Sequence, residues 1–364
     1  MKIIFFIDNL GSGGSQNQFV LLATALLKKG YQVSFFTYFS DDFFLSKLKT
    51  HNIDVHTSLK KDKLGLNVIF DFARLCNEKK PDIVISRLPT PNFYAACAKK
   101  LSTHTFKLIA THGSSTVYKS LSFIQKSTFR FSNHTADVMI CNSYHERDNL
   151  QAIFPKLKNK IHTVYNLIDF SRFPFKPSEK LTRKVLVVAS VSKYKRGLDI
   201  IESLHLVKEK EKLDFTLTWI GRKQYYKADT DNYFYKMSDK IKLYALENAW
   251  EWQEPNLEIE KEYNKYDALI LASDIEGLPN VVSEAMSCGL PILISNTLDH
   301  GHLIDDTVGG FLFEINDPKS LADALIALYQ LSFEDIKTMG QKSSERVRCL
   351  FNNEENINHY VKHF

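Results

Sequence analysis

The chain has 364 residues, of which 44% are apolar, 24% charged and 12% aromatic, a globular composition with room for two domains. No stretch reaches the roughly 18 to 20 apolar residues that a membrane-spanning helix needs, and Asp8 ends the first apolar run too early for a secretory signal. Five scattered cysteines without a C-x-x-C pair favour neither disulfides nor a cysteine-rich zinc site. We therefore expect a cytoplasmic protein in a reducing compartment.

The formal charge of +5 is divided unequally along the chain. Residues 1–167 hold 22 Lys and Arg against 11 Asp and Glu, a net +11, and the remainder holds 25 against 31, a net −6. A basic first half favours an anionic partner such as nucleic acid, a phosphorylated ligand or an acidic membrane surface. An ordinary lysine-rich surface explains the same counts equally well.

The first domain is predicted over residues 1–167. Its opening has the lengths of a βαβ unit, which implies a parallel sheet: strand 2–7, glycine-rich loop 8–16, helix 19–29 and strand 31–39. Further strands are predicted at 83–86, 107–111, 138–141 and 161–165. Together these elements predict a doubly wound α/β domain.

Residues 168–183 are predicted to be a linker, because Pro174 and Pro177 fit neither helix nor sheet. The α/β pattern then restarts and predicts a second domain over 184–345. Its predicted strands are 184–191, 215–220, 268–272 and 291–295, and its predicted helices are 198–210, 279–287 and 321–331. A C-terminal helix is predicted over 346–364, with a return to the N-terminal domain as one option.

The first loop carries Gly13 and Gly14 where a strand turns into a helix, so backbone N–H groups could approach an anion there. No acidic residue ends the second strand before Asp41, which weakens a dinucleotide interpretation. A purely structural glycine turn is an equally good explanation.

Two glutamates stand out in the segment 273–291. Gly277 and Pro279 indicate a loop turning into a helix, which places Glu276 in the loop and Glu284 inside the helix. The helix start at Leu278, Pro279, Asn280 and Val281 would suit a diphosphate, and the carboxylates would suit sugar hydroxyls. A solvated helix with two surface acids has the same spacing.

In this order the motifs resemble glycosyltransferase family 4, a group of retaining enzymes with the GT-B fold. The resemblance rests on Gly13–Gln16 with Gly30–Val33, Lys80–Ile83, Cys141–Ser143, Tyr165–Asp169, Glu276–Glu284 and Gly309–Phe313. It implies two Rossmann-like doubly wound domains facing a cleft, with the acceptor bound by the first and a nucleotide-sugar by the second.

The resemblance also implies roles for single residues of the donor site. Glu284 would bind the ribose hydroxyls, Glu276 would lie by the donor sugar, and Lys195 would bind the diphosphate. Where the family usually has an arginine five residues before that lysine, this chain has Ser190. Lys193 or Arg196 could supply the missing charge, as could the helix start.

Two further residues follow predicted strands of the first domain. His112 matches a family histidine near the donor sugar, and with Glu276 and Lys195 it completes the predicted catalytic set. Arg87 is a candidate contact for an anionic acceptor. The resemblance supplies no agreed nucleophile: the acceptor hydroxyl would attack on the face that the nucleotide leaves, and a phosphate oxygen would take the proton.

We therefore expect a retaining glycosyltransferase that moves a hexosyl or N-acetylhexosaminyl group from a nucleotide-sugar, with UDP favoured, to a saccharide or lipid-linked saccharide. Bacterial surface polysaccharide or lipopolysaccharide assembly is the expected setting. A sugar-nucleotide epimerase or hydrolase of the same architecture is the alternative, followed by a non-enzymatic binder of anionic ligands. Nucleic acid is not expected, because no recognition motif accompanies the basic charge.

No cofactor or metal is expected. Asp229–Asp231 forms an Asp-x-Asp without a preceding strand, and His300–His302 has no further ligands nearby, so that a loop is the better account. Residues 118–131 place Lys119, Lys126 and Arg130 among large apolar residues in a predicted helix. Such a helix could lie on an anionic membrane, which would make the protein peripheral to the inner face of the cytoplasmic membrane; an ordinary core-facing helix is the alternative.

Overall fold

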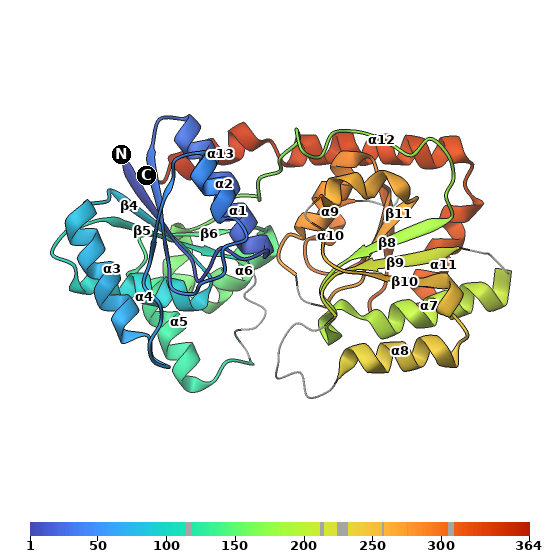
Figure 1. Cartoon of the computed structure of the whole chain (residues 1–364), viewed down its shortest axis with the longest axis horizontal. Helices are drawn as coiled ribbons and strands as arrows, with labels where there is room; N and C mark the ends of the chain where they lie inside the picture. Colours follow the sequence, from blue (N-terminus) through green and yellow to red (C-terminus); the bar gives the residue numbers. More distant parts are fainter. Residues whose placement is uncertain are drawn as a thin grey trace. The chain divides into compact units, whose positions relative to one another are not determined.

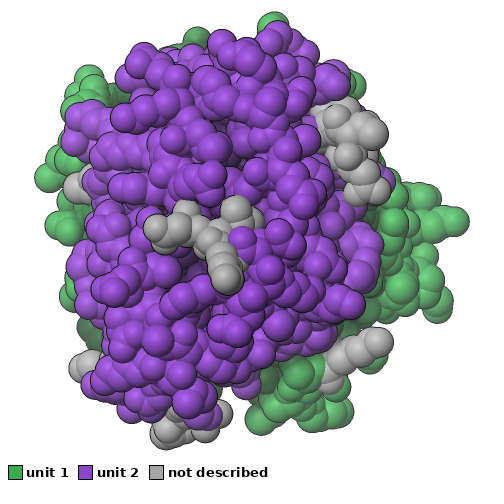
Figure 2. Space-filling model, turned by 90° about the vertical axis from the view of Figure 1, so that its right-hand side faces the viewer, with its two compact units in different colours: residues 1–167, 352–364 green, residues 168–351 purple. Residues whose placement is uncertain are grey.

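The computed structural model describes residues 1–113, 118, 120–211, 215–223, 232–256, 258–274, 276–304 and 309–364. The chain divides into two compact units, Met1–Leu167 with Asn352–Phe364 and Ile168–Phe351, which Figure 2 colours separately. Each unit holds one parallel sheet covered by helices on both faces. The predicted pair of doubly wound α/β domains is therefore confirmed.

The sheet of the first unit has the order β3-β2-β1-β4-β5-β6-β7, and all its strands are parallel. Its strands are β1 (Lys2–Phe6), β2 (Gln32–Thr37), β3 (Asp54–Thr57), β4 (Ile83–Arg87), β5 (Lys107–His112), β6 (Val138–Cys141) and β7 (Ile161–Thr163). The strand order reverses between β1 and β4. The sequence did not predict β3, which forms one edge of the sheet, whereas β7 at the other edge was predicted.

Helices cover both faces of this sheet, and each face has its own core. One face holds α1 (Gly14–Lys28), α2 (Leu45–Thr50) and α13 (Asn353–Val361), and the other holds α3 (Leu66–Lys79), α4 (Pro89–Leu101), α5 (Phe123–Thr135) and α6 (Tyr144–Ile153). Neighbouring side chains of a strand point to opposite faces. Phe5 accordingly stacks on Phe35 in one core, while Phe6 contacts Phe36 and Phe72 in the other.

The last helix, α13, belongs to the first unit although the second unit precedes it in the sequence. Ile357 and Tyr360 are buried in the core that α1 also covers, and Phe364 meets the ring of Tyr31 at 5.4 Å. Both ends of the chain therefore lie in this unit (Figure 1). The tail predicted as one helix over 346–364 is two helices, because α12 (Phe333–Leu350) ends before Asn352 caps α13.

The second sheet has the order β10-β9-β8-β11-β12-β13, again with all strands parallel. Its strands are β8 (Lys184–Val188), β9 (Thr216–Ile220), β10 (Trp250–Gln253), β11 (Ala268–Leu271), β12 (Ile292–Ser295) and β13 (Gly310–Phe313). One face holds α7 (Gly197–Glu211), α8 (Tyr233–Leu243) and α11 (Pro318–Gln330), and the other holds α9 (Asn280–Cys288), α10 (His300–Leu303) and α12 (Figure 1).

Trp219 is the largest fully buried side chain of the second unit, and its indole Nε1 donates to the carbonyl oxygen of Ala189 at 2.7 Å. This bond fixes the chain just beyond β8, where the predicted diphosphate loop begins. None of the helices among the described residues combines the length and apolar character needed to cross a membrane.

Candidate active site

The second sheet reverses its strand order between β8 and β11. In open α/β sheets, ligands bind beyond the carboxyl ends of the strands at such a reversal, because the flanking loops diverge there. The loop after β8 carries Ser190, Lys193, Lys195 and Arg196, and the loop after β11 carries Glu276. The topology therefore brings two distant sequence motifs to one edge.

Lys195 and Glu276 form an ion pair across these two loops. The N–H of Asp274 donates to the carbonyl oxygen of Tyr194 at 3.0 Å, which joins the loops, and the Ser273 hydroxyl donates to Glu276 at 3.3 Å. About a fifth of each paired side chain stays exposed, 23% for Lys195 and 20% for Glu276. Burial lowers the pKa of Lys195 to about 8. The ammonium group is thus preorganised by one carboxylate and still reachable by an anion.

The two other cations of this loop are placed differently. The Arg196 guanidinium donates from Nε to Asp199 at 2.9 Å, and its Nη1 lies 3.6 Å from Asp274. Its charge is therefore already balanced inside the protein. Lys193 is exposed, with its ammonium nitrogen 5.3 Å from the ring centre of Tyr194. Ser190 is half-buried. That Lys193 or Arg196 supplies the positive charge missing at Ser190 stays a prediction.

Glu284 lies in the second turn of α9 and is half-buried. The hydroxyl of the fully buried Tyr263 donates to its Oε2 at 3.2 Å. Burial raises the pKa of Glu284 to about 7, against the opposing effects of the Tyr263 hydrogen bond and the nearby Arg172. Arg172 itself is paired with Glu260, its Nη2 2.8 Å from the carboxylate.

The N-terminus of α9 lies between the two glutamates in sequence. Pro279 precedes the first helical residue, no side chain caps the helix, and its first turn has no acidic residue. Leu278 and Pro279 are buried, whereas Asn280 and Val281 are half-buried. A helix start of this kind favours a negatively charged ligand through its amide groups and dipole.

His300 also lies near Lys195 at this site, a position that the His300–His302 pair in the sequence did not predict. Its Nδ1 is 2.8 Å from the carbonyl oxygen of Ser295, and its buried Nε2 has no partner among the described residues. Burial lowers its pKa to about 4, and the charge of Lys195 acts in the same direction. The expectation of a loop here was wrong, because His300–Leu303 forms the short helix α10.

Metal-binding groups of three or more His, Cys, Asp or Glu are absent from the described part of the chain. The Asp-x-Asp at 229–231 lies outside the described residues. Tyr263 and Arg172, which support Glu284, also carried no signal in the sequence. Their distance along the chain from Glu284 follows no motif, and only the fold brings them together.

Arg87 and His112 end neighbouring strands of the first unit and are both buried, with 6% and 7% of their surface exposed. Burial lowers the pKa of Arg87, while the charges of Tyr360 and Glu146 oppose that shift. Burial also lowers the pKa of His112 to about 4. Arg87 Nε and His112 Nε2 have no partner within the described ranges. Two donor-capable groups thus lie buried at the carboxyl edge of this sheet.

Gly13 and Gly14 also belong to the first unit, at the start of α1. A Cβ atom on Gly13 would come within 2.2 Å of the Gln16 amide oxygen, so a larger residue here would displace the Gln16 side chain. The Gln16 amide in turn donates to Asp8 at 3.0 Å. The predicted site residues are therefore divided: Gly13, Gly14, Arg87 and His112 lie in the first unit and the others in the second.

Two family models match successive parts of the chain. Residues 12–172 match the model described as Glycosyltransferase Family 4, and residues 169–346 match the model described as Glycosyl transferases group 1. Together the two models cover residues 12–346, which include the whole second sheet, every strand of the first sheet except β1, and all the predicted site residues.

Curated relatives show the same similarity. The chain is 26% identical over 286 residues to the UDP-Gal:alpha-D-GlcNAc-diphosphoundecaprenol alpha-1,3-galactosyltransferase of Escherichia coli, covering 74% of this chain and 71% of that protein. It is 25% identical over 337 residues to the GalNAc-alpha-(1->4)-GalNAc-alpha-(1->3)-diNAcBac-PP-undecaprenol alpha-1,4-N-acetyl-D-galactosaminyltransferase of Campylobacter jejuni, covering 89% of this chain and 88% of that protein.

Among solved structures, HepE of Anabaena in complex with UDP-glucose superposes with a TM-score of 0.84 at 17% identity, and the match covers 100% of both chains. At this identity the likeness establishes the fold. It agrees with the two parallel sheets and their alternating helices.

Proposed function

Because the chain belongs to the glycosyltransferases, with a family 4 segment followed by a group 1 segment, we propose that it is a retaining enzyme that uses a UDP-sugar. It transfers a hexosyl or N-acetylhexosaminyl group to a lipid-linked saccharide during assembly of a bacterial surface polysaccharide. The observation that carries this proposal is the Lys195–Glu276 pair, with Glu284, at the strand reversal of the second sheet.

The donor half of the proposal rests on the chemistry of these groups. Glu284 has one donor, Tyr263, and can accept hydrogen bonds from ribose hydroxyls. Lys195 and the start of α9 supply positive charge for a diphosphate. Glu276 lies beside Lys195, where a donor sugar on that diphosphate would present its hydroxyls. Support for UDP comes from HepE of Anabaena, whose crystal structure contains UDP-glucose.

The transfer step then needs no covalent intermediate with the protein. The bond between the anomeric carbon and the diphosphate oxygen breaks, the acceptor hydroxyl oxygen bonds to that carbon on the same face, and its proton passes to a phosphate oxygen. Lys195 stabilises the charge that grows on the departing UDP. His112 and Arg87 are proposed to position the acceptor.

One assay distinguishes glycosyl transfer from hydrolysis and from epimerisation of the UDP-sugar. The protein is incubated with UDP-sugars, with and without an undecaprenyl diphosphate-linked saccharide, and UDP release and the product's anomeric configuration are followed. We expect UDP release to depend on the acceptor and the product to keep the donor's α configuration. Equal UDP release without acceptor would favour a hydrolase, and an altered UDP-sugar without UDP release would favour an epimerase.

The shifted pKa values predict a bell-shaped dependence of UDP affinity on pH. Below about pH 7 Glu284 is protonated and loses acceptor capacity, and above about pH 8 Lys195 loses its charge. Affinity should therefore be highest between these values. Calorimetry from pH 5.5 to 9.5 checks this: Glu284→Gln should flatten the acidic limb and Lys195→Arg the basic limb. Unchanged limbs in both variants would contradict the assignment.

We propose that helix α5 of the first unit binds a membrane surface. Phe123 and Ile124 at the start of α5 are 84% and 74% exposed. Beside them Arg130 donates to the Tyr118 hydroxyl at 3.0 Å, and Lys126 lies over the same ring. Large apolar residues exposed beside cations suit the boundary of an anionic bilayer. Lys119, the third cation of the predicted helix, lies outside the described residues.

The double variant Phe123→Ser, Ile124→Ser should therefore reduce retention on vesicles containing acidic lipid, measured by sedimentation at low salt. Retention of the wild-type protein should fall as salt rises, because screening removes the attraction between basic side chains and the bilayer. Leu243→Ser is the matched control, since Leu243 is 76% exposed on α8 of the second unit. Equal loss in both variants would contradict a membrane role for α5.

A further inference from the structure

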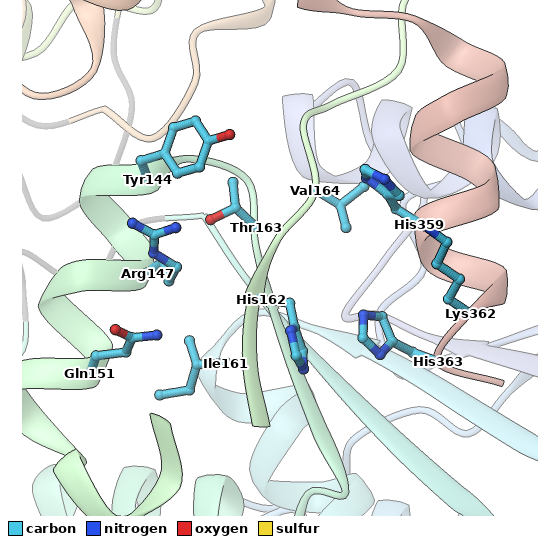
Figure 3. A pocket seen from close by; sticks show the side chains of 10 residues that line it. All are labelled: Tyr144, Arg147, Gln151, Ile161, His162, Thr163, Val164, His359, Lys362 and His363. Carbon is cyan, nitrogen blue, oxygen red and sulfur yellow. The ribbon is translucent and has the colours of Figure 1, made fainter. Parts of the chain in front are cut away.

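A second site lies in the first unit, at the outer edge of its sheet. There a cavity of about 340 Å³ follows the edge strand β7 between helices α6 and α13. Figure 3 shows Tyr144, Arg147 and Gln151 of α6 on one side and the side chains of residues 359, 362 and 363 on the other. The residues proposed for sugar transfer do not line this cavity.

The lining is rich in cationic and hydrogen-bond-donating groups. It includes Arg147, Lys362 and the three imidazoles of His162, His359 and His363, and among the described residues that line it there is no Asp or Glu. Two of the lining residues are paired with carboxylates outside the lining. Asp148 accepts from Arg147 at 2.8 Å and Glu355 lies 3.9 Å from His359, and both are about 60% exposed. These carboxylates are screened by water and offset the positive charge only weakly.

Two of the imidazoles are held face to face in the cavity wall. The ring centres of His162 on β7 and His363 after α13 are 4.2 Å apart at 30°. Burial, and then the charges of His162, Lys107, His359 and Lys362, lower the pKa of His363 to about 4. Burial also lowers the pKa of His162. Without a ligand, the pair therefore stays neutral near pH 7, because burial disfavours protonation of both rings and neighbouring positive charges add to this effect at His363.

The edge strand adds backbone groups to the same wall. The N–H of Val164 donates to Cys141 on β6 at 2.9 Å, so alternation along the strand turns the N–H of Thr163 away from β6 and toward the cavity. β7 has only three residues, which offers an incoming peptide strand few ladder bonds. A compact anion with several oxygens matches the concentrated donors better than an extended peptide.

We propose that this cavity binds a phosphate-bearing anion, which Arg147 and Lys362 hold and which promotes protonation of the His162–His363 pair. A phosphate would replace the repulsion around the imidazoles by attraction, so that binding and proton uptake reinforce each other. The source is either a free phosphate compound or a lipid headgroup. The proposal does not depend on sugar transfer, because its ligand and its residues are different.

Titration calorimetry of the whole chain with inorganic pyrophosphate tests the proposal. Affinity should fall as pH rises from 6 to 8, because binding and protonation of the imidazole pair are linked. Proton uptake, measured in buffers of different ionisation enthalpy, should be smaller in His363→Gln than in the wild type, which separates the imidazoles from the ionisation of pyrophosphate itself. Arg147→Gln and His363→Gln should each weaken binding about tenfold or more. Arg74→Gln is the matched control, since Arg74 is an exposed, carboxylate-paired arginine on α3 of the same unit.

A second experiment, with vesicles containing phosphatidic acid, shows whether the bound phosphate belongs to a free compound or to a lipid headgroup. Saturable pyrophosphate binding that is lost in the variants identifies a free phosphate compound, and vesicle retention lost in the same variants identifies a headgroup. Either result supports the proposal. The proposal would be overturned by wild-type protein that binds neither pyrophosphate nor the vesicles, by binding of both that is unchanged in both variants, or by an affinity that is independent of pH. UDP affinity, measured in parallel, should remain at the wild-type value, which separates this test from that of the donor site.

Discussion

Glu284→Ala is expected to weaken UDP binding by about a hundredfold while leaving the fold intact. Two ribose hydroxyls donating to one carboxylate contribute about 1.5 to 3 kcal/mol each, and losing about 3 kcal/mol raises Kd about a hundredfold. Calorimetric titration with UDP at pH 7.5 measures the change. Circular dichroism and thermal melting check the fold.

The matched control is Glu258→Gln, because Glu258 is exposed and paired with Lys261 in the same unit. It should bind UDP as the wild type does. An Ala variant at residue 284 with wild-type affinity would remove Glu284 from the donor site. ADP and GDP titrations then show whether the loss is shared by all ribose diphosphates, as the proposed ribose contact requires.

The same carboxylate should lower the stability of the free protein at neutral pH. Its pKa rises from 4.5 to about 7 on folding, so the folded state binds the proton more tightly and stability falls as pH rises from about 4.5 to 7. Glu284→Gln removes this cost and should raise Tm at pH 8 by about 5 °C. Near pH 4.5 the two proteins should melt alike. Calorimetric scans at both pH values measure the difference, and a constant difference at both would contradict it.

Lys195→Ala is expected to lower kcat by about a hundredfold to a thousandfold, with a smaller change in donor KM. Removing a group that stabilises charge in the transition state typically has an effect of this size, and charge on UDP grows as the bond to the sugar breaks. Lys193→Ala, two residues earlier and exposed, tests the alternative that Lys193 supplies this charge. Steady-state kinetics with saturating acceptor measure both variants.

Two outcomes would contradict this role. A Lys195→Ala variant with wild-type kcat would leave Lys195 outside the transition state, and a large loss in Lys193→Ala would transfer the role to Lys193. Arg196 is a poorer candidate for that replacement, because Asp199 and Asp274 already balance its charge.

The central strands of both units and the helices α1, α7, α9 and α11 were predictable from the sequence because they are apolar runs or amphipathic repeats. The helices α3, α4 and α12 were not placed. The edge strands β3, β10 and β13 were not predicted. Asp54–Thr57 is short and mostly polar, Trp250–Gln253 alternates two aromatic with two polar residues, and Gly310–Phe313 has only four residues and begins with glycine. Helix α1 begins at Gly14. The sequence predicted its start only at residue 19, because the first turn of the helix is polar and lacks an apolar repeat. The intrinsic preference of these residues for strand or helix is weak. Contacts with the neighbouring strand, or with the next turn of the helix, therefore decide the structure.

The candidate site was predictable only where residues close in sequence carry it. Glu276 and Glu284 belong to one segment, and the sequence placed them correctly in a loop and a helix. The partners Tyr263 and His300 are positioned by tertiary packing, which no local pattern encodes. The same holds for the cavity beside β7, whose walls come from residues 144–151, 161–164 and 359–363.

The position of α13 has a consequence for synthesis on the ribosome. The first unit needs residues 352–364 to cover Ile357, Tyr360 and the core around them, yet these residues are translated after the whole second unit. At about 5 to 20 residues per second, the first 167 residues wait on the order of ten to forty seconds with one face of their sheet partly uncovered. During that interval the nascent chain exposes an apolar surface that chaperones recognise, and the order of folding runs against the order of translation.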